Sequence, residues 1–265
     1  MLNNTFQCEL AKTYSPNVKI GACMLQPKLD GCRAWAALVN GEVQLFTRNG
    51  NLISGCNHIK QELSHILTTS DIVLDGELYS HGLTFQQIIK QVKSDGEQLQ
   101  FWAFDLIDGT QSGYFTRYNA LKSFVGACKH VLCVNTLGDA KSDLYAISDA
   151  LASALKDGYE GLIIRTDTPH VNGRSNGIFK LKQQQDAEFV VKDICKALKG
   201  GFVAVLCNEE GKVFKAALCG NVSEQRAIYY KRNRWINKQA TVKFNGYTDG
   251  GLPRFAKVVA IRNYE

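Results

Sequence analysis

A lysine, a tight turn and an arginine follow one another near the start of the chain, in the stretch Lys28-Leu29-Asp30-Gly31-Cys32-Arg33. An Asp-Gly pair favours a tight turn, which leaves the preceding lysine accessible. The arginine returns on the next strand, where it can hold a charged ligand near the amine. An amine attacks phosphorus only when it is neutral, so such a site needs burial or neighbouring cations. Taken alone, the stretch favours an ordinary turn flanked by solvated cations.

Two further segments place carboxylates beside apolar strands. In the stretch 74–79, alternation puts Asp75, Glu77 and Tyr79 on one face of a strand. A glutamate there could bind a ribose hydroxyl or a metal, and a solvent-facing acidic strand is the alternative. Glu160 leads into the apolar strand 161–165, which is a plausible metal position.

Two more strands complete the set. In 101–107, alternation groups Trp102 with Phe104, and a ring there could stack on a purine, although aromatics in an apolar strand usually belong to the core. In 178–182, Lys180 and Lys182 share one face. Two cations converging on one spot are costly unless an anion lies between them, and an α-phosphate would be such an anion.

The length and charge distribution indicate two domains. The chain has 265 residues, which is comfortable for two. Residues 1–185 carry 17 Lys+Arg and 17 Asp+Glu, whereas residues 186–265 carry 14 and 8, so the whole net charge of +6 lies in the last segment. A basic small domain beside a neutral larger one suggests a bound polyanion, with a merely basic soluble surface as the alternative.

The strand pattern predicts an α+β first domain and a barrel as the second. Asn40-Gly41 predicts a hairpin between 33–39 and 42–47, and helices are expected at 57–67, with Asn57 as the cap, and from Asp143 to Gly158. After Asp186, five strands are expected at 189–194, 202–207, 212–218, 240–244 and 257–261, with a helix near 224–230. Five strands in so short a segment fit an OB-fold barrel.

Composition excludes several classes of protein. No apolar run approaches the length that spans a bilayer, and the first residues lack the basic head and apolar stretch of a secretory signal. The nine cysteines are scattered without a C-x-x-C pair, which argues against a structural zinc site. We therefore expect an intracellular protein that is not secreted, with reduced thiols and no membrane partner.

The order of the five signals is more specific than any one of them. K-x-D-G-x-R, then D-G-E, F-D, E-G-L-I-x-R and K-x-K form the motif series of the covalent nucleotidyltransferases. The sequence resembles an ATP-dependent DNA ligase of the minimal, phage- or virus-like kind, over nearly the whole chain. The resemblance implies an adenylation domain at residues 1–185 and an OB-fold domain at residues 186–265. It also implies that the chain lacks the separate N-terminal DNA-binding domain of large ligases, because Lys28 lies so near the start.

The resemblance also implies a role for individual residues. Lys28 would be the nucleophile that becomes linked to AMP. The residues that would contact ATP are Gln26, Pro27, Arg33, Arg48, Glu77, Phe104, Lys180 and Lys182. Glu77 and Glu160 would bind magnesium, with manganese as the alternative metal. Arg254, Lys257 and Arg262 would orient the pyrophosphate, but the R-x-D-K ending of cellular ligases is absent, since Arg262 is followed by Asn263-Tyr264-Glu265.

The expected partner is nicked double-stranded DNA, bound by a monomer. Cations and aromatic residues interleave over 226–235, and the candidate phosphate contacts are Arg226, Lys231, Arg232 and Arg234. An amphipathic helix with its rings in the core explains the same pattern, and the two interpretations are compatible. Three rivals stay open: an mRNA-capping guanylyltransferase, an RNA ligase, and a non-catalytic nucleic-acid-binding OB-fold protein.

Overall fold

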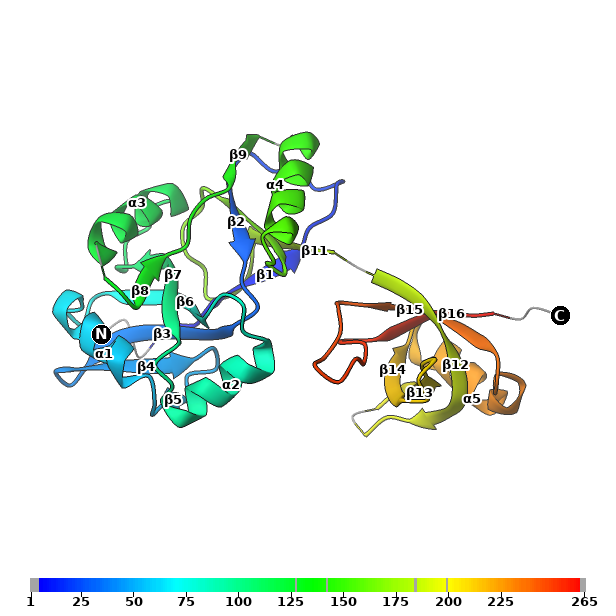
Figure 1. Ribbon diagram of the computed structural model, residues 1–265. Coiled ribbons are helices and arrows are strands. Elements are labelled where there is room, and N and C mark those ends of the chain that lie inside the picture. Colours follow the sequence, from blue (N-terminus) through cyan, green and yellow to red (C-terminus); the bar gives the residue numbers. More distant parts are fainter. Residues whose placement is uncertain (1–4, 127, 142, 184, 199, 263–265) are drawn as a thin grey trace. The chain divides into compact units, whose positions relative to one another are not determined.

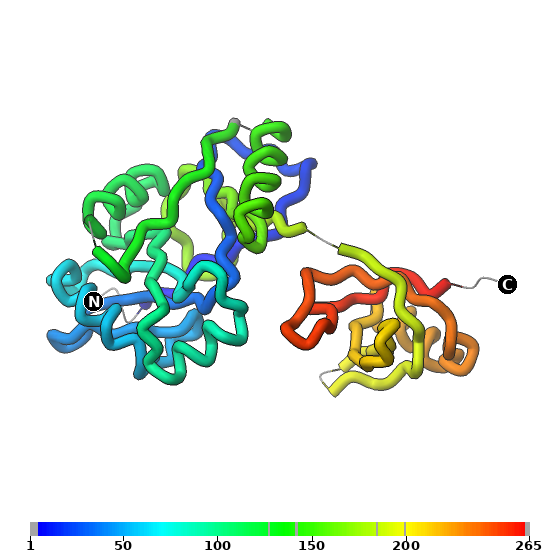
Figure 2. The backbone as a smooth tube through the Cα atoms, in the orientation of Figure 1, coloured from blue at the N-terminus to red at the C-terminus, as the bar shows by residue number. Residues whose placement is uncertain are grey.

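The structure is a computed structural model that describes residues 5–126, 128–141, 143–183, 185–198 and 200–262. The chain divides into two compact units, Met1–Lys182 and Gln183–Glu265, called the first and second units below. Figures 1 and 2 show the first unit in blue to green and the second from yellow-green to red. The second unit begins at Gln183, close to the Asp186 boundary that the sequence suggests.

One sheet of the first unit has the order β1-β11-β10-β2-β9. Its strands are β1 (Glu9–Thr13), β2 (Ala22–Lys28), β9 (Gly138–Lys141), β10 (Gly161–Thr166) and β11 (Gly173–Lys182). The three central strands are antiparallel, whereas β1 runs parallel to β11. Helix α4 (Leu144–Lys156) contacts β2, β9 and β10, and its Ile147 joins Leu25 and Leu162 in a buried cluster.

The other sheet of the first unit has the order β5-β4-β3-β6-β7-β8. Its strands are β3 (Cys32–Val39), β4 (Glu42–Thr47), β5 (Leu52–Ile53), β6 (Val73–Tyr79), β7 (Gln100–Ile107) and β8 (Val131–Cys133). Asn40 and Gly41 both have positive φ, as a two-residue hairpin turn requires, so the predicted hairpin is confirmed. The remaining helices of this unit are α1 (Asn57–Ile66), α2 (Phe85–Ser94) and α3 (Tyr114–Val125).

The helix ends agree with the sequence in one case and not in another. At α4, the Asp143 side chain accepts a hydrogen bond from the Tyr145 backbone, as a helix N-cap does. At α1, the prediction that Asn57 is the cap is wrong. Cys56 holds that position with a φ of 61° and no side-chain cap, and the Asn57 amide bonds Asp95 instead.

The second unit is a closed five-stranded barrel in the order β12-β13-β14-β16-β15. Its elements are β12 (Gln185–Lys196), β13 (Phe202–Cys207), β14 (Val213–Leu218), α5 (Val222–Tyr230), the 3-10 turn η2 (Arg232–Arg234), β15 (Gln239–Phe244) and β16 (Lys257–Ile261). Alternate residues of each strand fill the interior, among them Val191, Leu206 and Val242. The predicted α+β fold with an OB-fold barrel is confirmed. None of the helices in the described ranges has the length and apolar character to cross a membrane.

Candidate active site

A pocket of about 240 Å³ in the first unit gathers eight of the ten site residues predicted in that unit. Those that line it are Gln26, Pro27, Lys28, Arg33, Arg48, Glu77, Phe104 and Lys180. The wall also contains Glu9, Arg165 and Arg174, for which no role was predicted. Every residue of this wall belongs to the first unit.

Strand pairing places two lysines on either side of a glycine. Gly161 of β10 lies opposite Lys28 of β2 and also opposite Lys182 of β11. A side chain at Gly161 would collide with the Leu181 carbonyl oxygen at 2.2 Å, so the close approach of the strands requires glycine here. The carboxylate of the preceding residue, Glu160, then bridges the two lysines. Its Oε2 lies 2.5 Å from the Lys28 amine, and its Oε1 contacts the Lys182 amine.

Three cations surround this single carboxylate. Lys180 lies on the same strand as Lys182, and burial together with the charges of Lys182 and Lys28 lowers the pKa of its amine. Like charges held this close are costly unless an anion lies among them. Glu160 supplies one negative charge, and a phosphate group would supply the rest. This end of the pocket therefore suits a polyanion.

Glu77 and the turn after Lys28 are packed tightly against each other. A Cβ at Gly31 would lie 2.4 Å from the Leu78 carbonyl oxygen and 2.8 Å from the Glu77 side chain, so the turn needs glycine to reach β6. Burial raises the pKa of Glu77 to about 7, although Lys28 and Arg33 act in the opposite direction. A cation bound beside Glu77 would lower that pKa again.

Arg33 is held by Asp75 on the neighbouring strand. Its Nε and Nη2 donate to the two carboxylate oxygens at 2.7 and 2.6 Å, and Nη2 also donates to the Glu9 carbonyl. The guanidinium lies 4.4 Å from the centre of the Phe104 ring, and the Arg165 guanidinium lies 4.6 Å from the same ring. Phe104 thus forms part of the pocket wall, and the guanidinium groups of Arg33 and Arg165 lie close to its ring.

Gln26 is a buried residue of the pocket wall and lies two positions before Lys28 on β2. Its Oε1 lies 3.1 Å from the Tyr114 hydroxyl, which is also 2.8 Å from the Phe104 carbonyl oxygen. The hydroxyl has one hydrogen and cannot donate to both. The Gln26 Nε2 is buried and has no hydrogen-bond partner among the residues that the structure describes. One amide position of Gln26 is therefore left for a ligand, and turning the amide over would present its oxygen there and donate its NH2 to the tyrosine.

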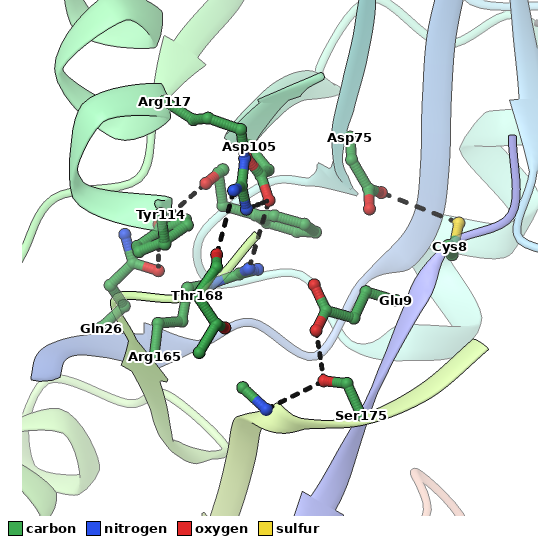
Figure 3. A network of polar contacts seen from close by, with 12 residues as sticks. Cys8, Glu9, Gln26, Asp75, Asp105, Tyr114, Arg117, Arg165, Thr168 and Ser175 are labelled. Carbon is green, nitrogen blue, oxygen red and sulfur yellow. Dashed lines mark hydrogen bonds and ion pairs between the residues drawn. The ribbon is translucent and has the colours of Figure 1, made fainter. Parts of the chain in front are cut away.

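A buried ion network is centred on Asp105, the residue after Phe104, and no motif in the sequence predicted it (Figure 3). Arg117 of α3 donates to both oxygens of Asp105 at 2.9 and 3.0 Å, and also to the Thr168 carbonyl oxygen. Arg165 approaches the same carboxylate at 3.8 Å. The network joins α3, β7 and β10 directly beneath the pocket, so it positions both Phe104 and Arg165. Arg117 lies on a helix that the sequence analysis did not predict, which is why its role was missed.

The predicted metal ligands, Glu77 and Glu160, can supply part of a metal ion's coordination shell, and substrate oxygens and water would have to supply the rest. Within the described ranges, no group of three or more His, Cys, Asp or Glu side chains could hold a metal ion. Glu77 and Glu160 interact electrostatically with each other and both lie near Lys28. Magnesium usually binds one or two carboxylates and completes its shell with substrate phosphates and water. These two carboxylates fit that arrangement with a triphosphate present.

The remaining predicted residues lie on the second unit. Arg226, Lys231 and Arg234 are exposed, while the Arg232 guanidinium rests 4.8 Å from the Tyr229 ring. Ile228, Tyr229 and Trp235 pack against the barrel core, so the rings face inward while the cations face outward. Arg254 precedes β16, Lys257 begins it, and Arg262 follows it with its Nε 3.4 Å from Glu188.

Comparison with known proteins identifies the family. The family model described as "ATP dependent DNA ligase domain" matches residues 3–182. A DNA ligase of African swine fever virus is 30% identical over 191 residues, 67% of this chain and 45% of the viral protein. The chain thus spans less than half the length of that viral relative. A DNA ligase of Haemophilus influenzae is 29% identical over 259 residues, 93% of this chain and 89% of the bacterial one.

A solved structure supports the same assignment over both units. It comes from a study of Lig E DNA ligases, "DNA binding with a minimal scaffold", and superposes with a TM-score of 0.80 at 26% sequence identity. The match covers 97% of this chain and 99% of the other. The resemblance inferred from the motif series is confirmed: the chain belongs to the family of ATP-dependent DNA ligases.

Proposed function

We propose that this chain seals 3′-hydroxyl/5′-phosphate nicks in duplex DNA through an AMP group carried by Lys28. The observation that supports this most is the company that Lys28 keeps. It shares one pocket wall with Lys180, Gln26 and Phe104, and Glu160 bridges its amine to that of Lys182. A nucleotide whose phosphates meet the lysines would place its base near the amide and the ring.

In the first step, the Lys28 Nζ attacks the α-phosphorus of ATP in line. A phosphorus–nitrogen bond forms, the bond to the β-phosphate oxygen breaks, and pyrophosphate leaves. The amine must lose a proton, and the Glu160 carboxylate 2.5 Å away is the nearest group to accept it. Lys180 and Lys182 stabilise the charge on the α-phosphate oxygens. Glu77 and Glu160 would hold magnesium, or manganese in its place, and the metal would supply further positive charge.

The second and third steps use the same cations. The AMP passes from Lys28 to the 5′-phosphate of the nick, which forms a phosphoanhydride and releases the amine. The 3′-hydroxyl then attacks the 5′-phosphate, the phosphodiester forms, and AMP leaves. Because each step is a phosphoryl transfer, positioning and positive charge do most of the catalysis.

The buried amide of Gln26 favours adenine over guanine as the base. With its oxygen turned toward the pocket, Gln26 would accept a hydrogen bond from the 6-amino group of adenine, whereas guanine carries an acceptor oxygen at that position. A site built to pair a polar group rejects the analogue that leaves it unpaired. This argument favours ATP and counts against the guanylyltransferase alternative.

The second unit is proposed to hold the DNA by its phosphates. The cations Arg226, Lys231, Arg232 and Arg234 project from α5 and the turn after it, where Tyr229 and Trp235 pack against the barrel core and Tyr230 is exposed. We propose that Arg254, Lys257 and Arg262 orient the pyrophosphate in the first step, and that the enzyme acts as a monomer.

The experiment that tests this function follows the AMP group. Protein charged with α-labelled ATP and freed of nucleotide is mixed with magnesium and a nicked duplex, an intact duplex or a nicked RNA. The proposal expects the label to leave the protein only with nicked DNA and a sealed strand to appear. Transfer to RNA ends alone would favour the RNA ligase alternative. Labelling by GTP instead of ATP would favour capping.

A further inference from the structure

A buried carboxylate outside the motif series borders the nucleotide pocket. Glu9 on β1 is only 3% exposed and lines the pocket together with Arg33 and Arg165. Its Oε1 accepts a hydrogen bond from the Ser175 hydroxyl, which in turn accepts one from the Gly177 backbone (Figure 3). These contacts across β1 and β11 fix the orientation of the carboxylate.

This carboxylate is buried without a direct ion pair, and the charge of Arg117 acts on it from beyond ion-pair distance. Within the described part of the chain, no Lys, Arg or His nitrogen forms an ion pair with it, and the nearby Arg33 donates to the Glu9 backbone instead. Its second oxygen, Oε2, accepts no hydrogen bond from any described residue. An ionised carboxylate removed from water without such partners carries a large free-energy cost. A group from a bound ligand would reduce that cost.

The position of Glu9 along the strands decides which part of a nucleotide it can meet. On β11, Lys180 and Lys182 lie toward the end that faces Lys28, whereas Glu9 contacts Ser175 near the other end. On β1, Glu9 pairs with Gly173, whereas Thr13, four residues later, pairs with Lys180, which is about 13 Å of strand at roughly 3.3 Å per residue. Glu9 therefore lies away from the phosphate-binding lysines, at the end of the pocket left for the nucleoside.

We propose that Glu9 is a specificity-determining residue that recognises the nucleoside part of the nucleotide, an inference that rests on the proposed function of the pocket. Its Oε2 accepts a hydrogen bond from a donor on the nucleoside, either the 6-amino group of adenine or a ribose hydroxyl. Ionised phosphates offer no donor, so they cannot be its target. A base with an acceptor in that place would be repelled by the carboxylate.

The test measures nucleotide binding to the full-length protein without divalent metal, so that no adenylate forms. The ligands are ATP, purine riboside 5′-triphosphate, which lacks the 6-amino group, and the 2′- and 3′-deoxy forms of ATP. Wild-type protein is expected to bind one of these analogues at least about 10-fold more weakly than ATP. Glu9→Leu should bind ATP and that analogue with equal affinity. Glu9→Gln, which keeps one neutral acceptor, should recover part of the preference for ATP.

Ratios between ligands make the result independent of the fraction of folded protein. The analogue that binds more weakly than ATP to the wild type, but equally well to Glu9→Leu, lacks the group that donates to Glu9. Glu97→Gln, a charge removal at an exposed site elsewhere in the first unit, should keep every wild-type ratio. If the ratios in Glu9→Leu equal those of the wild type, the role of Glu9 is refuted while the pocket assignment stands. If the wild type binds none of the nucleotides, the proposed function itself fails.

Discussion

The carboxylate of Glu160 lies 2.5 Å from the amine of Lys28 and also contacts the amine of Lys182. The proposed nucleophile is thus held by the same group that holds one of the phosphate-binding lysines. All three side chains are largely buried, with between 15% and 21% of each exposed. Since the arrangement depends on one carboxylate, the charge of Glu160 should matter more for the first step than its size.

Glu160→Gln should therefore lose adenylation while keeping the fold. The substitution removes the proton acceptor and leaves three amines without a counter-charge, and we expect the rate of AMP-protein formation to fall by at least about 100-fold. The measurement is single-turnover labelling with ATP and magnesium. Glu42→Gln, at an exposed position on β4, is the matched control and should label at the wild-type rate. A Glu160→Gln protein that labels as fast as the control would remove Glu160 from the mechanism.

The raised pKa of Glu77 predicts a pH dependence of stability in the nucleotide-free protein. Burial raises this pKa to about 7 from an ordinary value of 4.5, so the folded state binds the proton more tightly than the unfolded state. The stabilisation is complete below pH 4.5 and is lost as the pH rises toward 7. Glu77→Gln should reduce the change in the free energy of unfolding over this pH range by on the order of 1 kcal/mol. Urea unfolding at several pH values measures it, and parallel profiles for the two proteins would contradict the prediction.

The buried pair of Arg117 and Asp105 should contribute strongly to stability. Arg117→Ala leaves Asp105 buried with only the more distant Arg165 nearby, and breaking a buried pair in this way costs about 3–5 kcal/mol. Chemical denaturation gives the free energy of unfolding. Lys122→Ala removes an exposed cation from the same helix, where it rests against the Tyr118 ring, and should cost less than about 1 kcal/mol. Equal losses of unfolding free energy in the two variants would show that the buried pair stabilises the fold no more than the exposed cation does.

The cations after α5 should set the salt dependence of DNA binding. Replacing Lys231 and Arg234 together with alanine should reduce the slope of log K against log salt by about 2, since each phosphate contact contributes about 0.9. The loss of DNA affinity should be the same for nicked duplexes of different sequence, because phosphate contacts carry no sequence information. Lys212→Ala, on the turn between β13 and β14 where Lys212 pairs with Glu210, is the control within the same unit. An unchanged slope in the double variant would place the DNA elsewhere.

The sequence predicted the parts of the site that depend on local spacing. The Asp-Gly turn after Lys28 and the alternation of Lys180 with Lys182 are short-range patterns, and the structure brings these residues into or beside one pocket. The five strands of the barrel were also expected, from short segments rich in apolar residues, and the structure contains all five. The roles of the individual residues stay predictions until the variants are measured.

Other features arise from contacts between distant segments and left no local signal. Glu9 meets Ser175 across 166 positions of sequence, and Arg33 meets Asp75 across 42. Such pairs follow from which strands become neighbours, which a single sequence does not specify. Helix α2 was missed although Thr84 and Gln87 form a capping box, a signal that could have located its start.

Peptide mapping of the labelled protein tests the central claim most directly. Wild-type protein incubated with ATP and magnesium is digested and examined by mass spectrometry, beside Lys28→Ala and Lys28→Arg. We expect one AMP group on the peptide that contains Lys28 and none on either variant, because alanine has no amine and the guanidinium of arginine stays protonated. AMP on another residue, or a Lys28→Arg protein that still seals nicks, would contradict the covalent mechanism.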